Sequence, residues 1–456
     1  MAEVLRRLRE LERATRPVGP ELAAAMTRRW DELPDRVKTP AQTLGRRMAG
    51  CEGTHGVFPR CNLACTPCYH SRDANRVRID AAHTTTEIDA QMALLAAVRG
   101  PGQNAQLIGG EVTLLGADGH AAALEAMRRH GRKPMSMTHG DFDYDYLERL
   151  AIGPDGPRFD HLSFAGHFDS MMFGRRGIRR AAREADLNPY RARFCAMFDR
   201  LEREHGVTSY LAHNMTVTPE NADQIPRLIA DCRDMGFRMF SFQPAAFIGN
   251  RARWKGAYRT LSDDEIWALI GAGAGARLPH EMIQVGDVRC NRTAHGGYVG
   301  RRWVPVLDDR EPGDHAARDA FYRTFGPMDF EAPLLAARLA RAVAAQPGSL
   351  AVAASWARRF VGRCGGLGEL RRHGFRPVTF VMHNFMDAAV VRPAWAALRA
   401  GAVAADPAVR AAQERLEACS YAMAHPETGE LVPACAQHAV YDPAENEALA
   451  RLLPMA

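Results

Sequence analysis

The chain has 456 residues, of which 46% are hydrophobic and 25% charged. This is the composition of a soluble globular protein and excludes disorder as the main state. At about 150 residues per domain, the length predicts two or three domains, or one large barrel with additions. The net charge of +6 is small for this length and indicates no nucleic-acid partner. There is no apolar run of about 18 residues and no secretory signal, so we expect a cytoplasmic protein without a transmembrane segment.

Residues 1–50 predict an N-terminal helical extension, with arginine-rich helices interrupted near Pro17 and Pro34. From residue 51 to 250, short apolar runs alternate with helical patterns, which is typical of βα units and a parallel sheet. We expect an α/β fold with a partial (β/α)6 barrel, and a flat doubly wound sheet is the alternative. A site should lie at the carboxyl ends of the strands. The expected strands are residues 55–58, 106–110, 135–138, 160–165, 210–218 and 237–244.

Other signals place helices and turns. Thr84 and Glu87 are spaced as a capping box, and Gly100 should end the same helix. Residues 251–456 are expected to form an α+β C-terminal region that covers the substrate or holds an auxiliary group. Within it, residues 333–363 predict helix, and Glu427–Gly429 predicts the turn of a hairpin.

Three of the ten cysteines, Cys61, Cys65 and Cys68, lie within eight residues. In a reducing compartment such thiols are not expected to form disulfides, and they suit iron–sulfur clusters and zinc. The alternative is a helix face with three buried thiols, but Pro67 would break that helix. A tetrahedral zinc site would take His70 as its fourth ligand.

The segment CNLACTPCY (61–69) resembles the C-x3-C-x2-C signature of the radical S-adenosylmethionine (radical SAM) superfamily. The resemblance implies that Cys61, Cys65 and Cys68 bind a [4Fe-4S] cluster and that S-adenosylmethionine chelates its open iron. One-electron reduction would then release a 5′-deoxyadenosyl radical, which abstracts hydrogen from the substrate. The resemblance also implies that Tyr69 lies near the adenine, although Pro67 stands where the family commonly has an aromatic residue.

A second motif, Gly109-Gly110-Glu111, ends the second expected strand. It is similar to the family's GGE motif, whose backbone and carboxylate contact the methionine ammonium of the cofactor. A partly buried ammonium requires acceptors and a counter-charge. The alternative is a glycine turn followed by a solvated glutamate.

Through the same resemblance, three polar residues on later strands match cofactor-contacting positions: Ser163, Asn214 and Gln243. For each, a structural hydrogen bond is an equal alternative. His139, Asp141 and His167 belong to the same expected rim and could face the substrate.

Cys419 and Cys435 fall opposite one another about the predicted hairpin turn. Their closeness suits an auxiliary iron–sulfur cluster, with Cys290 and Cys364 (or Cys51) as further ligands, or two buried core thiols. Residues 383–387 and 418–435 resemble C-terminal parts of radical SAM enzymes that act on lipids, such as archaeal tetraether lipid synthases. The arginine-rich helix expected at 350–363 could rest on an anionic membrane surface or pack on its own domain.

The leading hypothesis is a radical SAM enzyme, an oxidoreductase or transferase with a small-molecule, lipid or peptide substrate and a reductant such as ferredoxin or flavodoxin. One alternative is an iron–sulfur electron-transfer or redox-sensing protein that does not cleave S-adenosylmethionine. Another is a zinc-stabilised binding module. Glu111 and the barrel pattern favour the enzyme, because an electron carrier needs neither.

Overall fold

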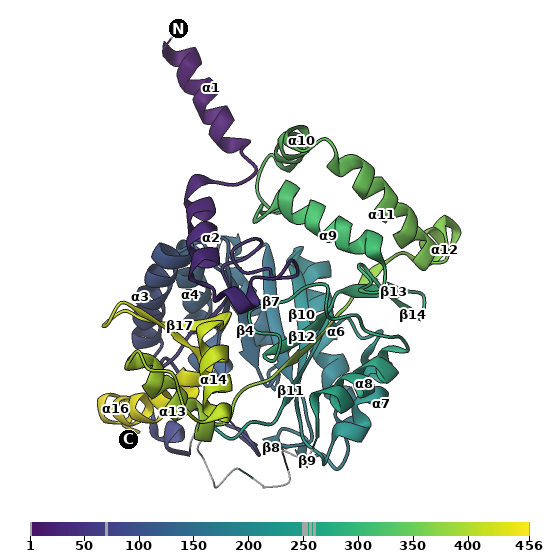
Figure 1. The fold of residues 1–456 in the computed structure, drawn as a ribbon. Helices are drawn as coiled ribbons and strands as arrows, with labels where there is room; N and C mark the ends of the chain where they lie inside the picture. Colours follow the sequence, from purple (N-terminus) through teal and green to yellow (C-terminus); the bar gives the residue numbers. More distant parts are fainter. Residues whose placement is uncertain (1, 69–71, 249–253, 255–257, 259–260, 456) are drawn as a thin grey trace.

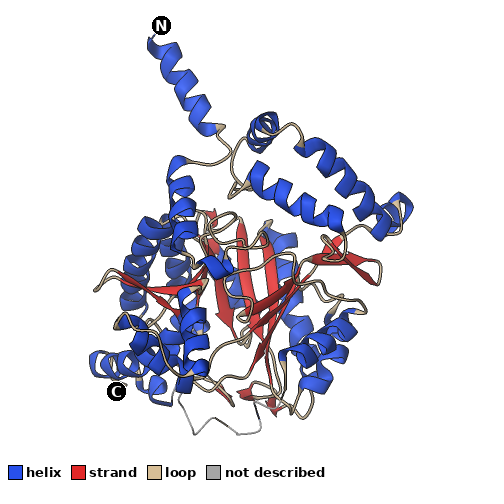
Figure 2. Cartoon of the chain, in the orientation of Figure 1, coloured by secondary structure: helices blue, strands red, loops and turns tan. Residues whose placement is uncertain are grey.

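The computed structural model describes residues 2–68, 72–248, 254, 258 and 261–455 (Figure 1). Its centre is a curled, mostly parallel sheet with helices around it (Figure 2). Among the described residues, this sheet has ten strands in the order β12-β16-β11-β10-β7-β4-β3-β1-β17-β18. Neighbouring strands from β16 to β17 are parallel, and the edge strands β12 and β18 are antiparallel to their neighbours. The described strands therefore form a half-barrel whose carboxyl ends share one edge.

The strands of this sheet have the following bounds: β1 Cys51–Gly53, β3 Asn104–Leu107, β4 Lys133–Thr138, β7 His161–His167, β10 Thr208–Val217, β11 Met239–Pro244, β12 Asn291–Ala294, β16 Thr379–His383, β17 Tyr421–His425 and β18 Glu430–Pro433. A small sheet pairs β2 (Ala64–Cys65), β8 (Met172–Arg175) and β9 (Ile178–Arg180). The other short strands are β5 Ile152–Gly153, β6 Gly156–Pro157, β13 Gly296–Val299, β14 Arg302–Pro305 and β15 Arg376–Pro377.

Most of the expected strands are present, with bounds shifted by up to three residues. The expectation of a strand at 55–58 is wrong, because the strand at this place is β1, a few residues earlier. The chain leaves the extended conformation at Gly56, where φ is +63°. Beyond it, Val57 and Phe58 are buried, and the hydroxyl of Thr84 donates to the Val57 carbonyl at 2.7 Å. This apolar run therefore packs beneath a helix instead of pairing in the sheet.

The C-terminal half contributes to the same sheet. Strand β17 pairs with β1, and β16 pairs with β11, so residues beyond 251 extend the parallel sheet on both sides. The expected boundary near residue 250 therefore does not divide the sheet. A sequence pattern cannot show this, because the paired residues are 370 positions apart for β1 and β17 and 140 positions apart for β11 and β16.

Helices connect successive strands and pack against the sheet: α3 Ala81–Arg99, α4 Gly116–Arg129, α5 Tyr144–Ala151, α6 Asn188–His205 and α7 Ile225–Cys232. Helix α3 begins after Asp80, whose carboxylate caps the first turn. The expected capping box is wrong, because Thr84 and Glu87 lie inside α3. Its expected end is confirmed at Gly100, where φ is +72°.

The remaining helices lie at the periphery: α1 Ala2–Ala14, α2 Pro20–Glu32, α8 Asp263–Ala274, α9 Pro312–Phe325, α10 Leu335–Ala345, α11 Ser349–Arg363, α12 Leu367–His373, α13 Ala388–Arg399, α14 Pro407–Glu417, α15 Ala434–Ala436 and α16 Asp442–Leu452. Helices α1 and α2 occupy the expected N-terminal extension, and α1 projects from the body in Figure 1. Within the described residues, no helix combines the length and apolarity that a bilayer span requires.

Helix α11 packs on α9. Arg359 and Arg363 of α11 form ion pairs with the buried Asp314 of α9 at 3.0 and 2.7 Å. The indole of Trp356 donates to the Val306 carbonyl at 3.0 Å. Since these arginines point into the protein, the contacts favour packing on its own domain over a membrane surface for this helix.

Candidate functional site

The cysteine loop lies over the carboxyl edge of the half-barrel. Cys65 is in β2, which pairs with β8, and the register places Cys65 opposite Met172. Because β8 directly follows β7, this pairing holds the loop at the end of β7. The Cys61 N–H donates to Asn75 Oδ1 at 3.0 Å, and the Leu63 N–H contacts Cys61 Sγ at 3.4 Å.

The three thiols of the loop interact with one another. The hydrogen bond with Cys68, together with burial, raises the pKa of the Cys65 thiol, and the Cys61 thiol adds to this effect. All three cysteines are free of disulfides and partly buried. Three neighbouring thiols on one loop fit a three-cysteine iron–sulfur cluster, whose iron prefers soft thiolate ligands. Tyr69 and His70 lie outside the described residues.

The Gly109-Gly110-Glu111 segment packs directly on the chain that leads into Cys61. The Glu111 N–H donates to the Arg60 carbonyl at 2.9 Å, and the Gly110 N–H donates to the Phe58 carbonyl at 2.7 Å. A Cβ on Gly110 would lie 2.0 Å from the Arg60 oxygen, which no side chain permits. The glycines therefore allow two backbones to touch, and this contact brings the two sequence motifs to the same place.

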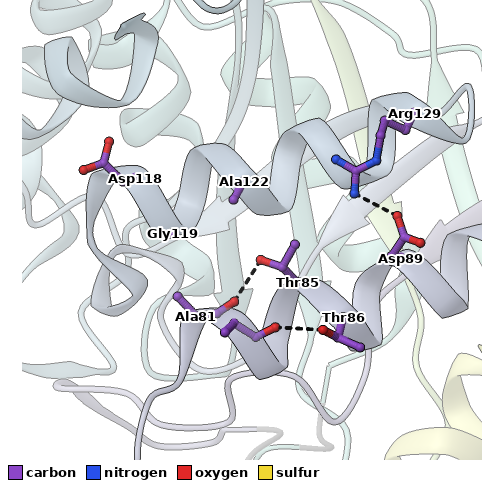
Figure 3. A pocket seen from close by; sticks show the side chains of 9 residues that line it. Ala81, Thr85, Thr86, Asp89, Asp118, Gly119, Ala122 and Arg129 are labelled. Carbon is purple, nitrogen blue, oxygen red and sulfur yellow. Dashed lines mark hydrogen bonds and ion pairs between the residues drawn. The ribbon is translucent and has the colours of Figure 1, made fainter. Parts of the chain in front are cut away.

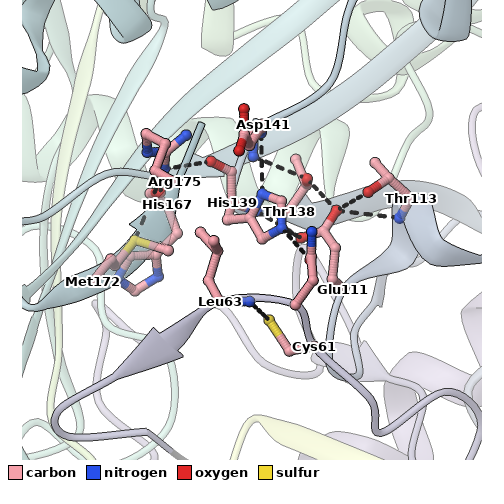
Figure 4. A network of polar contacts seen from close by, with 12 residues as sticks. Cys61, Leu63, Glu111, Thr113, Thr138, His139, Asp141, His167, Met172 and Arg175 are labelled. Atoms are coloured by element: carbon pink, nitrogen blue, oxygen red, sulfur yellow. Dashed lines mark hydrogen bonds and ion pairs between the residues drawn. The ribbon is translucent and has the colours of Figure 1, made fainter. Parts of the chain in front are cut away.

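The Glu111 carboxylate is buried, with 1% of the residue exposed, and protein donors hold both of its oxygens (Figure 4). Oε1 accepts from the Thr113 N–H at 3.1 Å, the Thr113 hydroxyl at 2.7 Å and the Thr138 hydroxyl at 2.7 Å. Oε2 accepts from the His139 N–H at 2.9 Å. These donors fix a negative charge beside the cysteine loop, and the alternative of a solvated glutamate is wrong.

His139 joins this network to the cysteine loop. Its Nδ1 accepts from the Asp141 N–H at 3.0 Å, so the proton is on Nε2, which donates to Asn62 Oδ1 at 2.8 Å. The Arg175 guanidinium donates to the His139 carbonyl at 2.7 Å. Burial lowers the pKa of His139, which agrees with a neutral ring.

A second polar group lies at the ends of β7 and β10. Asp169 Oδ2 lies 2.6 Å from His167 Nε2 and accepts from the Thr216 N–H at 3.1 Å. Burial acts to raise the pKa of Asp169, but the His167 imidazole and backbone donors hold it below its usual value. The Asp169 charge acts on the Cys65 thiol, which places this carboxylate beside the cysteine loop.

The three polar residues matched to cofactor-contacting positions, Ser163, Asn214 and Gln243, lie at different positions along their strands. Asn214 is buried in β10 and is paired with His167, while Gln243 is half-buried in β11 and is paired with Thr216. Both lie in the carboxyl-terminal parts of their strands. Ser163 lies near the amino end of β7 and contacts His161 Nε2 at 3.2 Å. Four residues of strand, about 13 Å, separate it from the end of β7, where the polar residue is His167.

The predicted hairpin is confirmed as β17 and β18, with Ala422 paired with Pro433. Cys419 and Cys435 flank it, and their interactions place a third cysteine, Cys290, beside them. Burial raises the pKa of Cys435 to about 12, and the charges of Cys419 and Cys290 add to the effect.

The surroundings of these cysteines are cationic. The Arg415 Nε–H donates to Cys290 Sγ at 3.4 Å, and the charge of Arg29 acts on Cys419. The charge of Cys419 also acts on Cys51 and contributes to the raised pKa of its thiol. Cys364 is not part of this group, because it is buried in a separate apolar cluster with Val299 and Val304.

A groove between α3 and α4 is lined by residues that belong to none of these networks (Figure 3). Asp89 and Arg129 in its lining form an ion pair at 2.9 Å, and the Thr85 hydroxyl bonds to its own helix. We assign no function to this groove, because its polar groups bond to one another.

Sequence reasoning missed Asn62, Asp169 and Arg175. The available signal was position: Asn62 follows the first cysteine, and Asp169 comes two residues after the end of β7. Nothing in the sequence around Arg175 indicated a role, because only the folded chain brings it to His139.

No family model matches the chain, and neither does any curated protein. Among solved structures, 27 chains match. They include anSMEcpe with bound AdoMet (S-adenosylmethionine), at 15% identity and a TM-score of 0.32. A histidine-tagged form with AdoMet gives 16% and 0.31, and a form with AdoMet and the Cp18Cys peptide gives 14% and 0.32. Each match covers 48% of this chain and 57% of the other chain, so it spans less than two thirds of those proteins. Similarity this low carries no inference about the activity of this chain.

Proposed function

We propose that this chain is a radical SAM enzyme in which Cys61, Cys65 and Cys68 bind a [4Fe-4S] cluster. The observation that carries the proposal is the contact between two motifs: the Gly109–Glu111 segment packs on the residues that lead into the three-cysteine loop. Both motifs lie at the carboxyl edge of a half-barrel, where α/β proteins place their sites.

When bound, the cluster and S-adenosylmethionine supply a one-electron donor and a group that abstracts hydrogen from carbon. The chain's own residues bind and orient these groups. The hydrogen bonds from the Cys61 N–H to Asn75 and from His139 to Asn62 hold the loop in place. Glu111 provides a fixed negative charge for the cofactor ammonium, as the resemblance implies.

The other cofactor contacts are proposed at Gly109, Gly110, Asn214, Gln243 and Tyr69. Ser163 belongs to the same set through the resemblance, and its place near the amino end of β7 gives it the weakest support. The substrate is a small molecule, lipid or peptide, and a cytoplasmic ferredoxin or flavodoxin is the proposed reductant.

The C-terminal cysteines support a second proposal, an auxiliary iron–sulfur site. The charge of Cys419 acts on the thiols of Cys51, Cys290 and Cys435, and the charge of Cys290 also acts on Cys435. Nearby arginines would offset the negative charge of thiolates. The proposed ligands are these four residues, and Cys364 is not among them.

The test is anaerobic purification followed by reduction in the presence of S-adenosylmethionine. The protein should contain iron and sulfide and should release 5′-deoxyadenosine and methionine. Cys61→Ala should abolish this release, whereas Cys195→Ala, which removes a buried helix thiol, should not. A reduced, cluster-containing protein that cleaves no S-adenosylmethionine would support the electron-transfer alternative. Zinc without iron or sulfide would support the binding module.

A further inference from the structure

A second group of metal-ligating side chains lies beside the cysteine loop and has no part in the function proposed above. Strands β1 and β17 are parallel neighbours, with Gly53 paired with Met423. His55 and His425 each lie two residues after this pair. Their rings stack with centroids 4.2 Å apart and an interplanar angle of 23°.

Glu445, on α16, faces both imidazoles. Its Oε2 lies 3.0 Å from His55 Nδ1, and its Oε1 lies 4.0 Å from His425 Nδ1. Glu427, in the β17–β18 turn, places Oε1 at 2.9 Å from His425 Nδ1. One ligand atom each from His55, His425 and Glu445 lie within 4.8 Å of one another. The two histidine side chains are only 8% and 5% exposed.

The Nε2 atoms of both rings donate hydrogen bonds. His55 Nε2 lies 2.7 Å from the Ala424 carbonyl oxygen, and His425 Nε2 lies 2.6 Å from Gln437 Oε1. The orientation of the Gln437 amide is fixed, because its Nε2 donates to Asp442 at 2.9 Å and to Glu445 at 3.0 Å. Since a carbonyl oxygen only accepts, both histidines must hold a proton on Nε2.

The Nδ1 atoms of the two rings then carry lone pairs, and this is unfavourable beside carboxylates. In neutral rings, the lone pairs of both Nδ1 atoms face carboxylate oxygens, and neither side can donate. Protonation of both rings would also satisfy these oxygens, but it would stack two cationic imidazoles with centroids 4.2 Å apart. A divalent cation would accept both lone pairs and the carboxylate at once. Donation of the other ring N–H to an oxygen is also the usual outer contact of a metal-bound histidine.

We propose that His55, His425 and Glu445 bind one divalent transition-metal ion of the zinc type, with Glu427 or water as the fourth ligand. Two imidazole nitrogens and carboxylate oxygen suit such ions better than Mg²⁺ or Ca²⁺. Bond lengths of about 2.0–2.1 Å place tetrahedral ligand atoms about 3.3 Å apart. The observed separations of 3.0 and 4.0 Å lie on either side of this value.

The ion would join three segments of the chain, at His55, His425 and Glu445, and so stabilise the region that precedes the cysteine loop. His55 precedes Cys61 by six residues, and its backbone is held by the Gln91 side chain. After the loop, the Arg78 N–H donates to the Leu453 carbonyl at 2.8 Å. Helix α16 and the residues that follow it therefore contact the chain on both sides of the cysteines, and the ion would strengthen the first of these contacts.

This inference does not rest on the proposed function, and its test reads metal binding directly. Zn²⁺ is titrated by calorimetry into the full chain with alanine in place of the loop cysteines (Cys61, Cys65 and Cys68) and of the proposed auxiliary ligands (Cys51, Cys290, Cys419 and Cys435), so that neither cysteine group can bind it. We expect one equivalent bound and a Zn²⁺-dependent rise in Tm that Mg²⁺ does not produce. Adding His425→Gln or Glu445→Gln should weaken Zn²⁺ binding at least about tenfold.

The matched control is Glu204→Gln, from the exposed group of Glu148, Glu204 and His205. Glu204 is already paired with Arg200 and Tyr144, so its replacement should leave Zn²⁺ affinity unchanged. The Tm rise is compared within each variant, so a variant with lower stability still reports binding.

Cobalt provides a second readout in the same variant, which lacks both cysteine groups. Co²⁺ bound to this site should show visible d–d bands without the near-ultraviolet thiolate charge-transfer band that cysteine ligation produces. A Kd weaker than about 100 µM for Zn²⁺, equal affinity in the His425→Gln protein, or a thiolate band with Co²⁺ would each overturn the proposal.

Discussion

The Nε2–H of His139 donates to Oδ1 of Asn62 across 2.8 Å, so the end of β4 is tied to the residue that follows Cys61. The same histidine offers its backbone N–H to Glu111 and accepts from the Asp141 N–H. One buried ring therefore aligns the cysteine loop with the carboxylate beside it.

Replacing His139 by leucine should loosen the cysteine loop. The lost hydrogen bond is worth about 1 kcal/mol, so we expect roughly fivefold less iron and sulfide to remain after repeated anaerobic desalting. His139→Gln, whose amide can still donate to Asn62, should retain more. Equal cluster retention in the leucine variant and the unmodified protein would show that the contact does not hold the loop.

Gly110→Ala should destabilise the protein strongly, because the new Cβ would meet the Arg60 carbonyl at 2.0 Å. Relief of this clash requires the two motifs to separate, at a cost of about 2–3 kcal/mol or more. The control is Gly368→Ala in α12, where a Cβ meets nothing within 4 Å and helix propensity should add up to about 1 kcal/mol. Urea unfolding midpoints measure both changes. A neutral Gly110→Ala would refute the close packing.

Glu111→Gln should lower both stability and cofactor affinity. The amide would place an NH2 group against donors from Thr113, Thr138 or His139, which costs about 1–3 kcal/mol. Thr113→Val removes one donor and keeps the charge, so it should lose stability but retain S-adenosylmethionine binding. Equilibrium dialysis with labelled S-adenosylmethionine separates the two effects. Unchanged binding in Glu111→Gln would remove this carboxylate from the cofactor site.

Iron counting decides whether the auxiliary site exists. If Cys290, Cys419 and Cys435 bind a cluster, the variant without Cys61, Cys65 and Cys68 should keep residual iron and sulfide. Adding Cys419→Ser and Cys435→Ser should then remove it. A variant that is iron-free after loss of the loop cysteines alone would identify the C-terminal thiols as core residues.

Stability should fall as the solution is acidified from pH 7 to pH 5. Burial lowers the pKa of His120 to about 3 and that of His383 to about 4, so both are neutral in the folded protein. The unfolded chain takes up protons below its usual histidine pKa of about 6.5. Stability from these groups is therefore complete above about pH 6.5 and is lost toward the folded pKa values, with about 2 kcal/mol from His120 alone by pH 5.

The check is the urea midpoint at both pH values. His120→Gln can keep hydrogen bonds to Ser136 and Tyr146 without a titrating ring, so its stability should depend less on pH. An identical pH dependence in the variant and the unmodified protein would contradict this origin.

Local patterns in the sequence predicted most of the half-barrel. The helix stop at Gly100 and the register of the β17–β18 hairpin follow from neighbours along the chain, and both are confirmed. The strand at 55–58 was wrong because apolar residues mark burial without specifying strand pairing. The partners of β1 and β11 from the C-terminal half could not be predicted, since strand pairing across 370 and 140 residues leaves no periodic signal.

The candidate site also combines residues that local patterns predict with contacts that only the fold creates. The three cysteines and Glu111 were found from spacing and motif, but the hydrogen bond between His139 and Asn62 joins residues 77 positions apart. Likewise, Cys290 and Cys364 were both expected beside Cys419 and Cys435, but only the fold separates them: the charge of Cys290 acts on Cys435, whereas Cys364 lies in a separate apolar cluster.

The pairing of β1 with β17 also sets an order of events during synthesis. Cys51 and its partner Tyr421 are separated by 370 residues, so the ribosome must make nearly the whole chain before this edge of the sheet can close. Until then, β1 lacks its neighbour on that side, and the segment before Cys61 lacks its contacts with His425 and Glu445. Insertion of the proposed cluster into the three-cysteine loop should therefore follow the synthesis of β17, and nascent chains stalled before residue 421 should bind iron poorly.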